Sequence, residues 1–158
     1  MKLSENFTWE EFIYSDVARV KGITNMPPEE VREEMIQNAK NLCENLLQKI
    51  RDEVGPLTIS SGYRSPNLNK IIKGSESSQH SKGMAADILC PRLSSLQLAH
   101  LIRNKFKFDQ LIYEKRLNKT TGKPYDWVHV SWVSEEKNRN QVLNSPISGG
   151  YVYGLPSK

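Results

Sequence analysis

One stretch in the middle of the chain places a carboxylate inside an apolar run, close to a histidine. Residues 78–89 read Ser-Gln-His-Ser-Lys-Gly-Met-Ala-Ala-Asp-Ile-Leu. His80 follows a serine-rich loop, and Asp87 falls within a small-residue strand predicted over 84–89. A carboxylate is costly to bury unless a cation or strong hydrogen-bond donors meet it. Because side chains alternate along a strand, Asp87 shares its face with Ala85, and the small neighbours leave room for a metal ion.

A second predicted strand carries another histidine. Residues 127–132 read Trp-Val-His-Val-Ser-Trp, and alternation puts His129 on the face opposite the two valines. A polar imidazole therefore projects from a strand whose other side is apolar. Two imidazoles and one carboxylate form a donor set that zinc accepts, with a fourth position left for water, as in catalytic rather than structural sites. Zinc lowers the pKa of such a water to about 7, which makes it a nucleophile at neutral pH.

Taken singly, these residues have ordinary alternative interpretations. A histidine and an aspartate seven residues apart, or one histidine in a strand, are also typical of satisfied core or surface positions. The carboxylate nearest to His129 along the chain is Asp126, three residues earlier, which makes it the candidate general base. Residues three apart in an ideal strand face opposite sides, so Asp126 reaches the metal only if the chain turns or bulges at 126–127.

The flanking patterns predict an α+β fold. A helical pattern with apolar residues every three or four positions, from Val31 to Val54, ends at Gly55. The predicted helices begin near Thr8, Ser15, Pro27 and Ser94, and the further predicted strands span residues 57–60 and 108–114. Helices followed by a run of strands indicate a small antiparallel sheet packed against helices. The tail from Ser145 is expected to be irregular.

Composition favours one ordinary globular domain. The chain has 158 residues, 37% hydrophobic and 25% charged, with a net charge of +4. No apolar stretch approaches the roughly 20 residues of a membrane helix, and no basic run is interleaved with aromatics, so we expect neither membrane insertion nor nucleic-acid binding. The N-terminus lacks the apolar core of a signal peptide, which predicts synthesis in the cytoplasm. Cys43 and Cys90 are predicted to be free, buried thiols.

Three blocks together resemble the M15 metallopeptidases, which include zinc D-alanyl-D-alanine carboxypeptidases and phage endolysins that cleave L-Ala–D-Glu bonds. The blocks are residues 60–69 (Ser-Ser-Gly-Tyr-Arg-Ser-Pro-Asn-Leu-Asn), 78–88 and 126–131, in the family's order. The resemblance implies a Hedgehog/DD-peptidase-like fold in a single peptidase domain, residues 1–158. Within it we expect N-terminal helices over 1–55, a zinc-binding core over 56–133 and the irregular tail.

The resemblance also implies residue roles. His80, Asp87 and His129 match the ligands of one zinc ion per chain. Asp126 matches the general base, and Arg64 matches the arginine that steadies the scissile carbonyl as it gains negative charge. Ser78 matches a serine near the substrate. For Glu114, which ends the predicted strand 108–114, a position behind a ligand histidine and a plain surface position both stay open.

The function implied is hydrolysis of peptide bonds in peptidoglycan stem peptides, as a D,D-carboxypeptidase or an L,D-endopeptidase. The alternative is a catalytically inactive zinc-containing binding module of the same fold, and the presence of both Asp126 and Arg64 favours the enzyme. Peptidoglycan is the expected partner of a monomeric protein. Action on the cell wall would then follow release from the cytoplasm, for instance during phage lysis.

Overall fold

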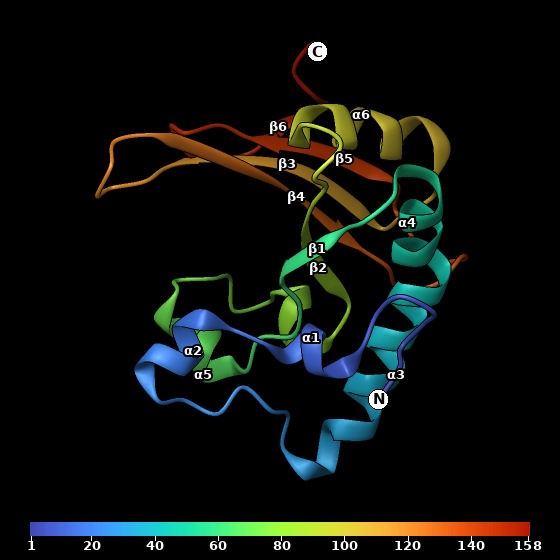
Figure 1. Cartoon of the computed structure of the whole chain (residues 1–158), viewed down its shortest axis with the longest axis vertical. Coiled ribbons are helices and arrows are strands. Elements are labelled where there is room, and N and C mark those ends of the chain that lie inside the picture. Colours follow the sequence, from blue (N-terminus) through green and yellow to red (C-terminus); the bar gives the residue numbers. More distant parts are fainter.

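A six-stranded sheet forms the centre of the computed structural model, which describes residues 1–158 (Figure 1). The strand order is β1-β2-β4-β3-β5-β6. The strands are β1 (Thr58–Ser61), β2 (Ala85–Leu89), β3 (Gln110–Leu117), β4 (Pro124–Ser131), β5 (Gln141–Ser145) and β6 (Val152–Tyr153). The α+β fold is confirmed. The sheet is larger than expected because β5 and β6 extend it, and it is mixed because β5 pairs parallel to β3.

The N-terminal third of the chain consists mainly of helices. They are α1 (Trp9–Ile13), α2 (Asp16–Lys21), α3 (Glu29–Leu42), a turn of π-helix η1 (Cys43–Leu47) and α4 (Gln48–Val54). Thr8 and Ser15 cap α1 and α2 through their side-chain oxygens, as their sequence positions predicted. The long helix ends before Gly55, also as predicted. Val31 is an exception to the predicted apolar face, since it is exposed at the start of α3.

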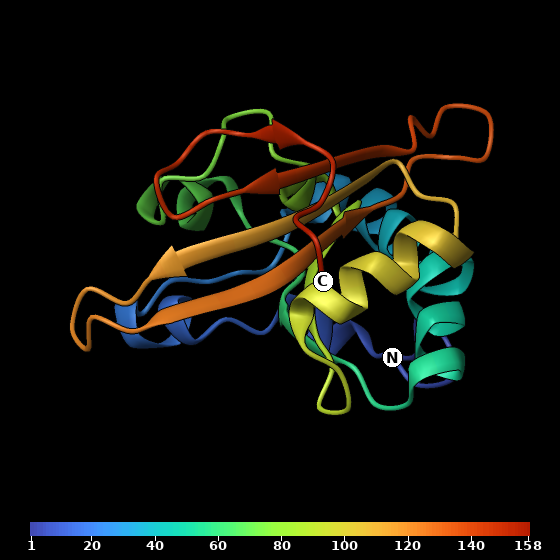
Figure 2. The same ribbon diagram turned by 90° about the horizontal axis from the view of Figure 1, so that it is seen from above.

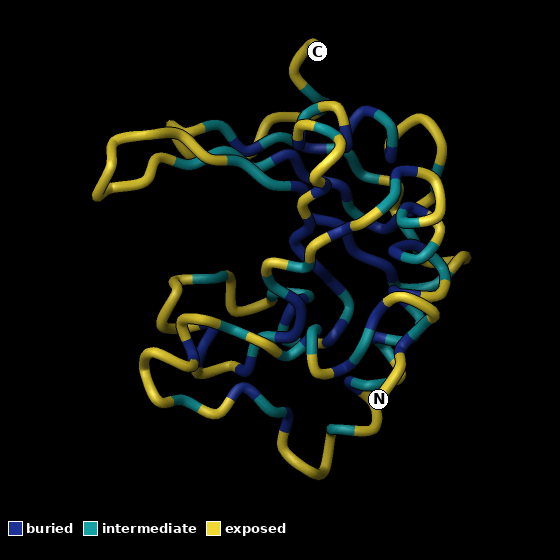
Figure 3. Tube along the Cα trace, in the orientation of Figure 1, coloured by how far each residue is buried: buried dark blue, intermediate teal, exposed yellow.

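The remaining helical segments connect the strands. They are α5 (Pro66–Ile71), a 3₁₀ turn η2 (Gln79–Lys82) and α6 (Ser95–Lys105). Ser94 and Gln97 form a full capping box at the start of α6. This helix packs on β3 and β4, as the view from above shows (Figure 2). Buried residues gather where the sheet meets the helices, whereas the turn joining β3 to β4 extends outward and is exposed (Figure 3).

The two faces of the sheet have different surroundings. Ala86, Ile88, Val128 and Val130 belong to the main hydrophobic core, together with residues of α1, α3, α4 and α6. Since neighbouring residues of a strand point to opposite faces, Asp87 and His129 project away from that core. The segment from Gly62 to Gly83 has α5 and η2 as its only helical elements, and it brings His80 to this second face.

Candidate metal centre

Three side chains converge on one point at the second face of the sheet. His129 Nδ1 lies 3.1 Å from Asp87 Oδ1, His80 Nε2 lies 3.2 Å from His129 Nδ1, and His80 Nε2 lies 3.3 Å from Asp87 Oδ1. All three residues are buried. Ligands about 2.0–2.1 Å from a tetrahedral ion are about 3.3–3.4 Å from one another. The nearly equilateral triangle of donor atoms therefore fits one such ion.

Strand pairing places two of the three residues side by side. Asp87 on β2 is the direct partner of His129 on β4 in an antiparallel pair, so both side chains leave the sheet on the same face. His80 comes from η2, which precedes β2. The Ser78 side chain caps η2 by accepting a hydrogen bond from the His80 backbone N–H (3.2 Å), and Gly83 ends the turn at a φ of +73°.

The orientation of the His80 ring is set by a backbone carbonyl. Its Nδ1 lies 2.8 Å from the carbonyl oxygen of Gly62. A carbonyl can only accept, so Nδ1 carries the proton and Nε2 offers its lone pair to the other two ligands. Gly62 is held against α1, where a Cβ would lie 2.2 Å from the Phe12 carbonyl oxygen. Only glycine fits this approach, which explains a glycine at that position.

The electrostatics of the cluster favour the protonation states that a metal requires. Burial would raise the pKa of Asp87, but its interactions with His80 and His129 outweigh burial, so this pKa lies well below its ordinary value. Burial also lowers the pKa of His80, against the opposing effect of Asp87. A carboxylate with a neutral imidazole is the form in which these residues bind a cation.

Arg64 lies beside the cluster. Its Nη2 is 3.6 Å from Asp87 Oδ2, on the side of the carboxylate away from the histidines. Its Nε donates to Ser61 Oγ and its Nη1 to Asn69 Oδ1, each at 3.1 Å. Burial lowers the pKa of Arg64, yet an arginine stays charged under ordinary conditions. The structure thus holds a fixed positive charge next to the predicted ligands.

Asp126 does not join this group. β4 is regular from Pro124 to Ser131 and its pairing with β3 has no bulge, so the irregularity that would turn Asp126 toward His129 is absent. Asp126 points to the opposite face of the sheet, where its Oδ2 accepts a hydrogen bond of 2.5 Å from the Tyr113 hydroxyl. This geometry does not support the predicted role of Asp126 as the base.

Glu114 is the carboxylate that the strand pairing brings to the face of the ligands instead. It is the direct partner of Trp127, two residues before His129 on β4. Its side chain is 13% exposed. Burial raises the pKa of Glu114, and the negative charge of Asp87 raises it further. The sequence placed Glu114 at a strand end but held no information on which residue of β4 it would meet.

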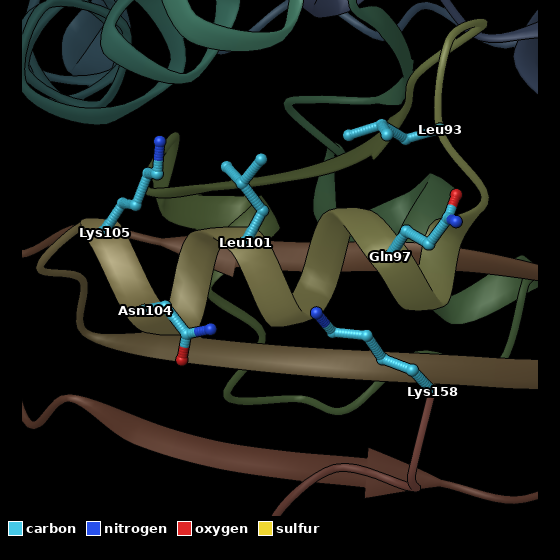
Figure 4. Close-up of a pocket in the computed structure, with 6 residues that line it drawn as sticks. All are labelled: Leu93, Gln97, Leu101, Asn104, Lys105 and Lys158. Carbon is cyan, nitrogen blue, oxygen red and sulfur yellow. The ribbon is translucent and has the colours of Figure 1, made fainter.

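Other features lie away from the metal centre. A surface pocket of about 360 Å³ runs along the outer side of α6 (Figure 4) and is lined by Leu93, Gln97, Leu101, Asn104, Lys105 and Lys158. It contains no cluster of metal-binding residues.

Cys43 and Cys90 are free and buried, as predicted. None of the helices has the length and apolar character needed to span a bilayer.

Comparison with known proteins agrees with the geometry. The model of a protein family described as Peptidase M15 matches residues 5–131. The matched region includes all three residues of the metal-binding triangle and Arg64. A comparison with curated proteins found no match. Because the family match covers most of the chain and the structure contains a buried His-Asp-His group suited to a metal ion, this chain belongs to the M15 peptidases, a family of metal-dependent enzymes.

Proposed function

We propose that this protein is a zinc-dependent peptidase that hydrolyses peptide bonds in the stem peptides of bacterial peptidoglycan, as a D,D-carboxypeptidase or an L,D-endopeptidase. The observation that carries the proposal is the triangle of His80, Asp87 and His129, whose donor atoms lie 3.1–3.3 Å apart. Imidazole nitrogens and a carboxylate oxygen in tetrahedral geometry suit zinc, and three protein ligands leave one position open. Membership of the M15 peptidases supports the same assignment.

In this proposal one zinc ion per chain supplies a water molecule whose pKa is lowered to about 7. The protein supplies the other requirements of peptide hydrolysis. Arg64 presents a guanidinium held by Ser61, Asn69 and the distal oxygen of Asp87, and it can meet the negative charge that develops on the scissile carbonyl oxygen. Because these neighbours already fix the guanidinium, little reorganisation is needed during the reaction.

Ser78 is proposed as a substrate-binding residue at the edge of the centre. Its hydroxyl oxygen accepts from the His80 backbone N–H, so its own O–H is free to donate to a carbonyl or carboxylate of the substrate. We further propose that residues 1–158 act as one domain and as a monomer. The net charge of +4 suits a surface rich in anionic polymers, such as a cell wall reached after release from the cytoplasm.

The competing candidate is a zinc-containing binding module of the same fold without peptidase activity. Such a module needs the three ligands but has no need for a charged donor beside them. The Arg64 side chain is only 12% exposed, and its ion-pair partner is Asp87, one of the predicted metal ligands. A buried charge in this position favours the enzyme.

Mass spectrometry of muropeptides would test the proposal. Zinc-loaded protein is incubated with purified peptidoglycan, and the released fragments are compared with those from a His129→Ala protein and from samples treated with a chelator. We expect loss of a terminal D-alanine or a cut within the stem peptide, from the zinc-loaded wild type alone. One tightly bound zinc without any cleavage would favour the binding module, and failure to bind zinc would overturn both candidates.

A further inference from the structure

We infer that Glu114, and not Asp126, is the general base of the proposed peptidase. This inference rests on the proposed function. Glu114 accepts a proton from the attacking water as the water oxygen bonds to the carbonyl carbon. It then returns that proton to the leaving nitrogen as the C–N bond breaks, so the carboxylate is regenerated and the products are one acid and one amine. General acid–base catalysis of this kind contributes a factor of about 10²–10⁴.

The pairing of β3 with β4 carries the inference. Ile112 is the partner of His129, and Glu114 is the partner of Trp127, with an unbroken register between them. Partners share a face, and so do residues two apart on one strand. Glu114 is thus the diagonal neighbour of His129 on the face that bears the metal centre. Diagonal neighbours have Cα atoms about 7–8 Å apart, a distance that a side chain as long as glutamate can span.

The same register places Asp126 on the face of the sheet opposite to the metal centre. Asp126 is the partner of Lys115, which flanks Glu114 and therefore lies on the other face. The Tyr113 hydroxyl, which hydrogen-bonds to Asp126, belongs to a residue of the hydrophobic core. The backbone of the sheet therefore lies between the Asp126 carboxylate and His129.

The neighbours of Glu114 suit a base that has to move a proton. Arg116 Nη2 lies 3.7 Å from Glu114 Oε1, too far for a hydrogen bond, so the carboxylate is steadied without being fully engaged. Arg116 also lies over the Trp127 ring, 5.9 Å from its centroid. The buried Trp127 Nε1–H is directed toward Glu114, and this donor favours the charged carboxylate that a base requires.

Two isosteric variants separate the carboxylates. Glu114→Gln and Asp126→Asn proteins are each assayed for zinc affinity by titration calorimetry, for thermal unfolding, and for kcat and KM on a purified muropeptide that the wild type cleaves. We expect Glu114→Gln to bind one zinc ion with affinity within about tenfold of wild type. Its kcat should fall by about 10²–10⁴ with little change in KM, because the lost interaction exists only in the transition state.

For Asp126→Asn we expect lower thermal stability, from the altered hydrogen bond to Tyr113, with kcat within a few-fold of wild type. A wild-type kcat for Glu114→Gln, or a collapse of kcat in Asp126→Asn alone, would overturn the inference. Loss of zinc from Glu114→Gln would also overturn it, because Glu114 would then support a ligand. These results leave the proposed function standing, whereas a zinc-loaded wild type that cleaves no muropeptide refutes the proposed function and the inference with it.

Discussion

Replacing Gly62 by alanine should weaken the fold and the metal centre together. Gly62 follows β1, and its carbonyl oxygen accepts the hydrogen bond from His80 Nδ1 at 2.8 Å. An added Cβ would lie 2.2 Å from the Phe12 carbonyl oxygen and 2.9 Å from two atoms of the Phe12 ring. Contacts below 3.0 Å are not tolerated, so α1 and this segment must separate by at least 0.8 Å, the difference between 3.0 and 2.2 Å.

The structure sets the size of the effect. Inserting a methyl group into a close-packed contact costs about 1–3 kcal/mol. The separation also stretches the 2.8 Å hydrogen bond from the Tyr63 N–H to the Phe12 carbonyl, a bond whose net contribution is about 0.5–1.5 kcal/mol. Together these terms lower the free energy of unfolding by about 1.5–4.5 kcal/mol. For a chain of this size the melting temperature should fall by about 3–18 °C. Displacing the carbonyl that orients His80 should weaken zinc binding about 10–100-fold.

Circular dichroism melting of the metal-free proteins and calorimetric titration with zinc measure the two effects separately. Gly122→Ala is the matched control, because a Cβ there meets nothing within 4 Å and only the strain of a φ of +70° applies. That variant should lose about 1–2 kcal/mol and keep its zinc affinity. If Gly62→Ala melted within about 2 °C of wild type and bound zinc equally well, the close approach of α1 to the His80 support would be refuted.

Three further predictions concern the metal, a buried carboxylate and the thiols. Zinc at a free concentration 100 times its Kd should raise the free energy of unfolding by about 2.7 kcal/mol, seen as a higher melting temperature, and His129→Ala should abolish the rise. Asp109 is buried, which would raise its pKa, but hydrogen bonds from Arg139 and Gln79 outweigh burial and lower it. The stabilisation that the charged Asp109 gives to the fold is therefore present above its ordinary pKa of 3.8 and is lost as the pH falls below that value. At pH 7 the free energy of unfolding of Asp109→Asn should therefore be about 1.5–3 kcal/mol below that of wild type. This difference in stability should narrow toward pH 3, and an equal difference at both pH values would contradict the prediction. Burial raises the pKa of the Cys43 thiol, and Cys90 is buried too. A thiol-specific reagent should therefore modify both cysteines only after denaturation. Rapid reaction of the folded protein would disprove their burial.

Features that depend on local chemistry could be predicted from the sequence. Thr8, Ser15 and Ser94 mark helix starts because their side-chain oxygens accept from backbone N–H groups only three residues away. Gly55 ends the long helix for a similarly local reason. The three blocks around Arg64, His80 and His129 also predicted the family, because chemistry restricts the residue types at such a site.

Features that depend on distant parts of the chain were missed or misplaced. β5 pairs with β3, more than 20 residues earlier in the chain, and β6 pairs with β5, about 10 residues earlier. The parallel pairing of β5 with β3 has no local signal in the sequence. Val31 follows the helical period of the buried residues, but no element covers it at the start of α3. Periodicity identifies a face, and only packing decides how far along the helix that face is covered.

The candidate site depends both on local chemistry and on contacts between distant parts of the chain. Donor chemistry and alternation within a strand are properties of short segments, and together with the family resemblance they predicted His80, Asp87 and His129 as ligands of one metal ion. The three-dimensional pairing of the strands was needed to show that their donor atoms meet within 3.3 Å and that Glu114, rather than Asp126, shares their face. The register between β3 and β4 decides which residues are neighbours, and a shift by one residue would exchange the two faces.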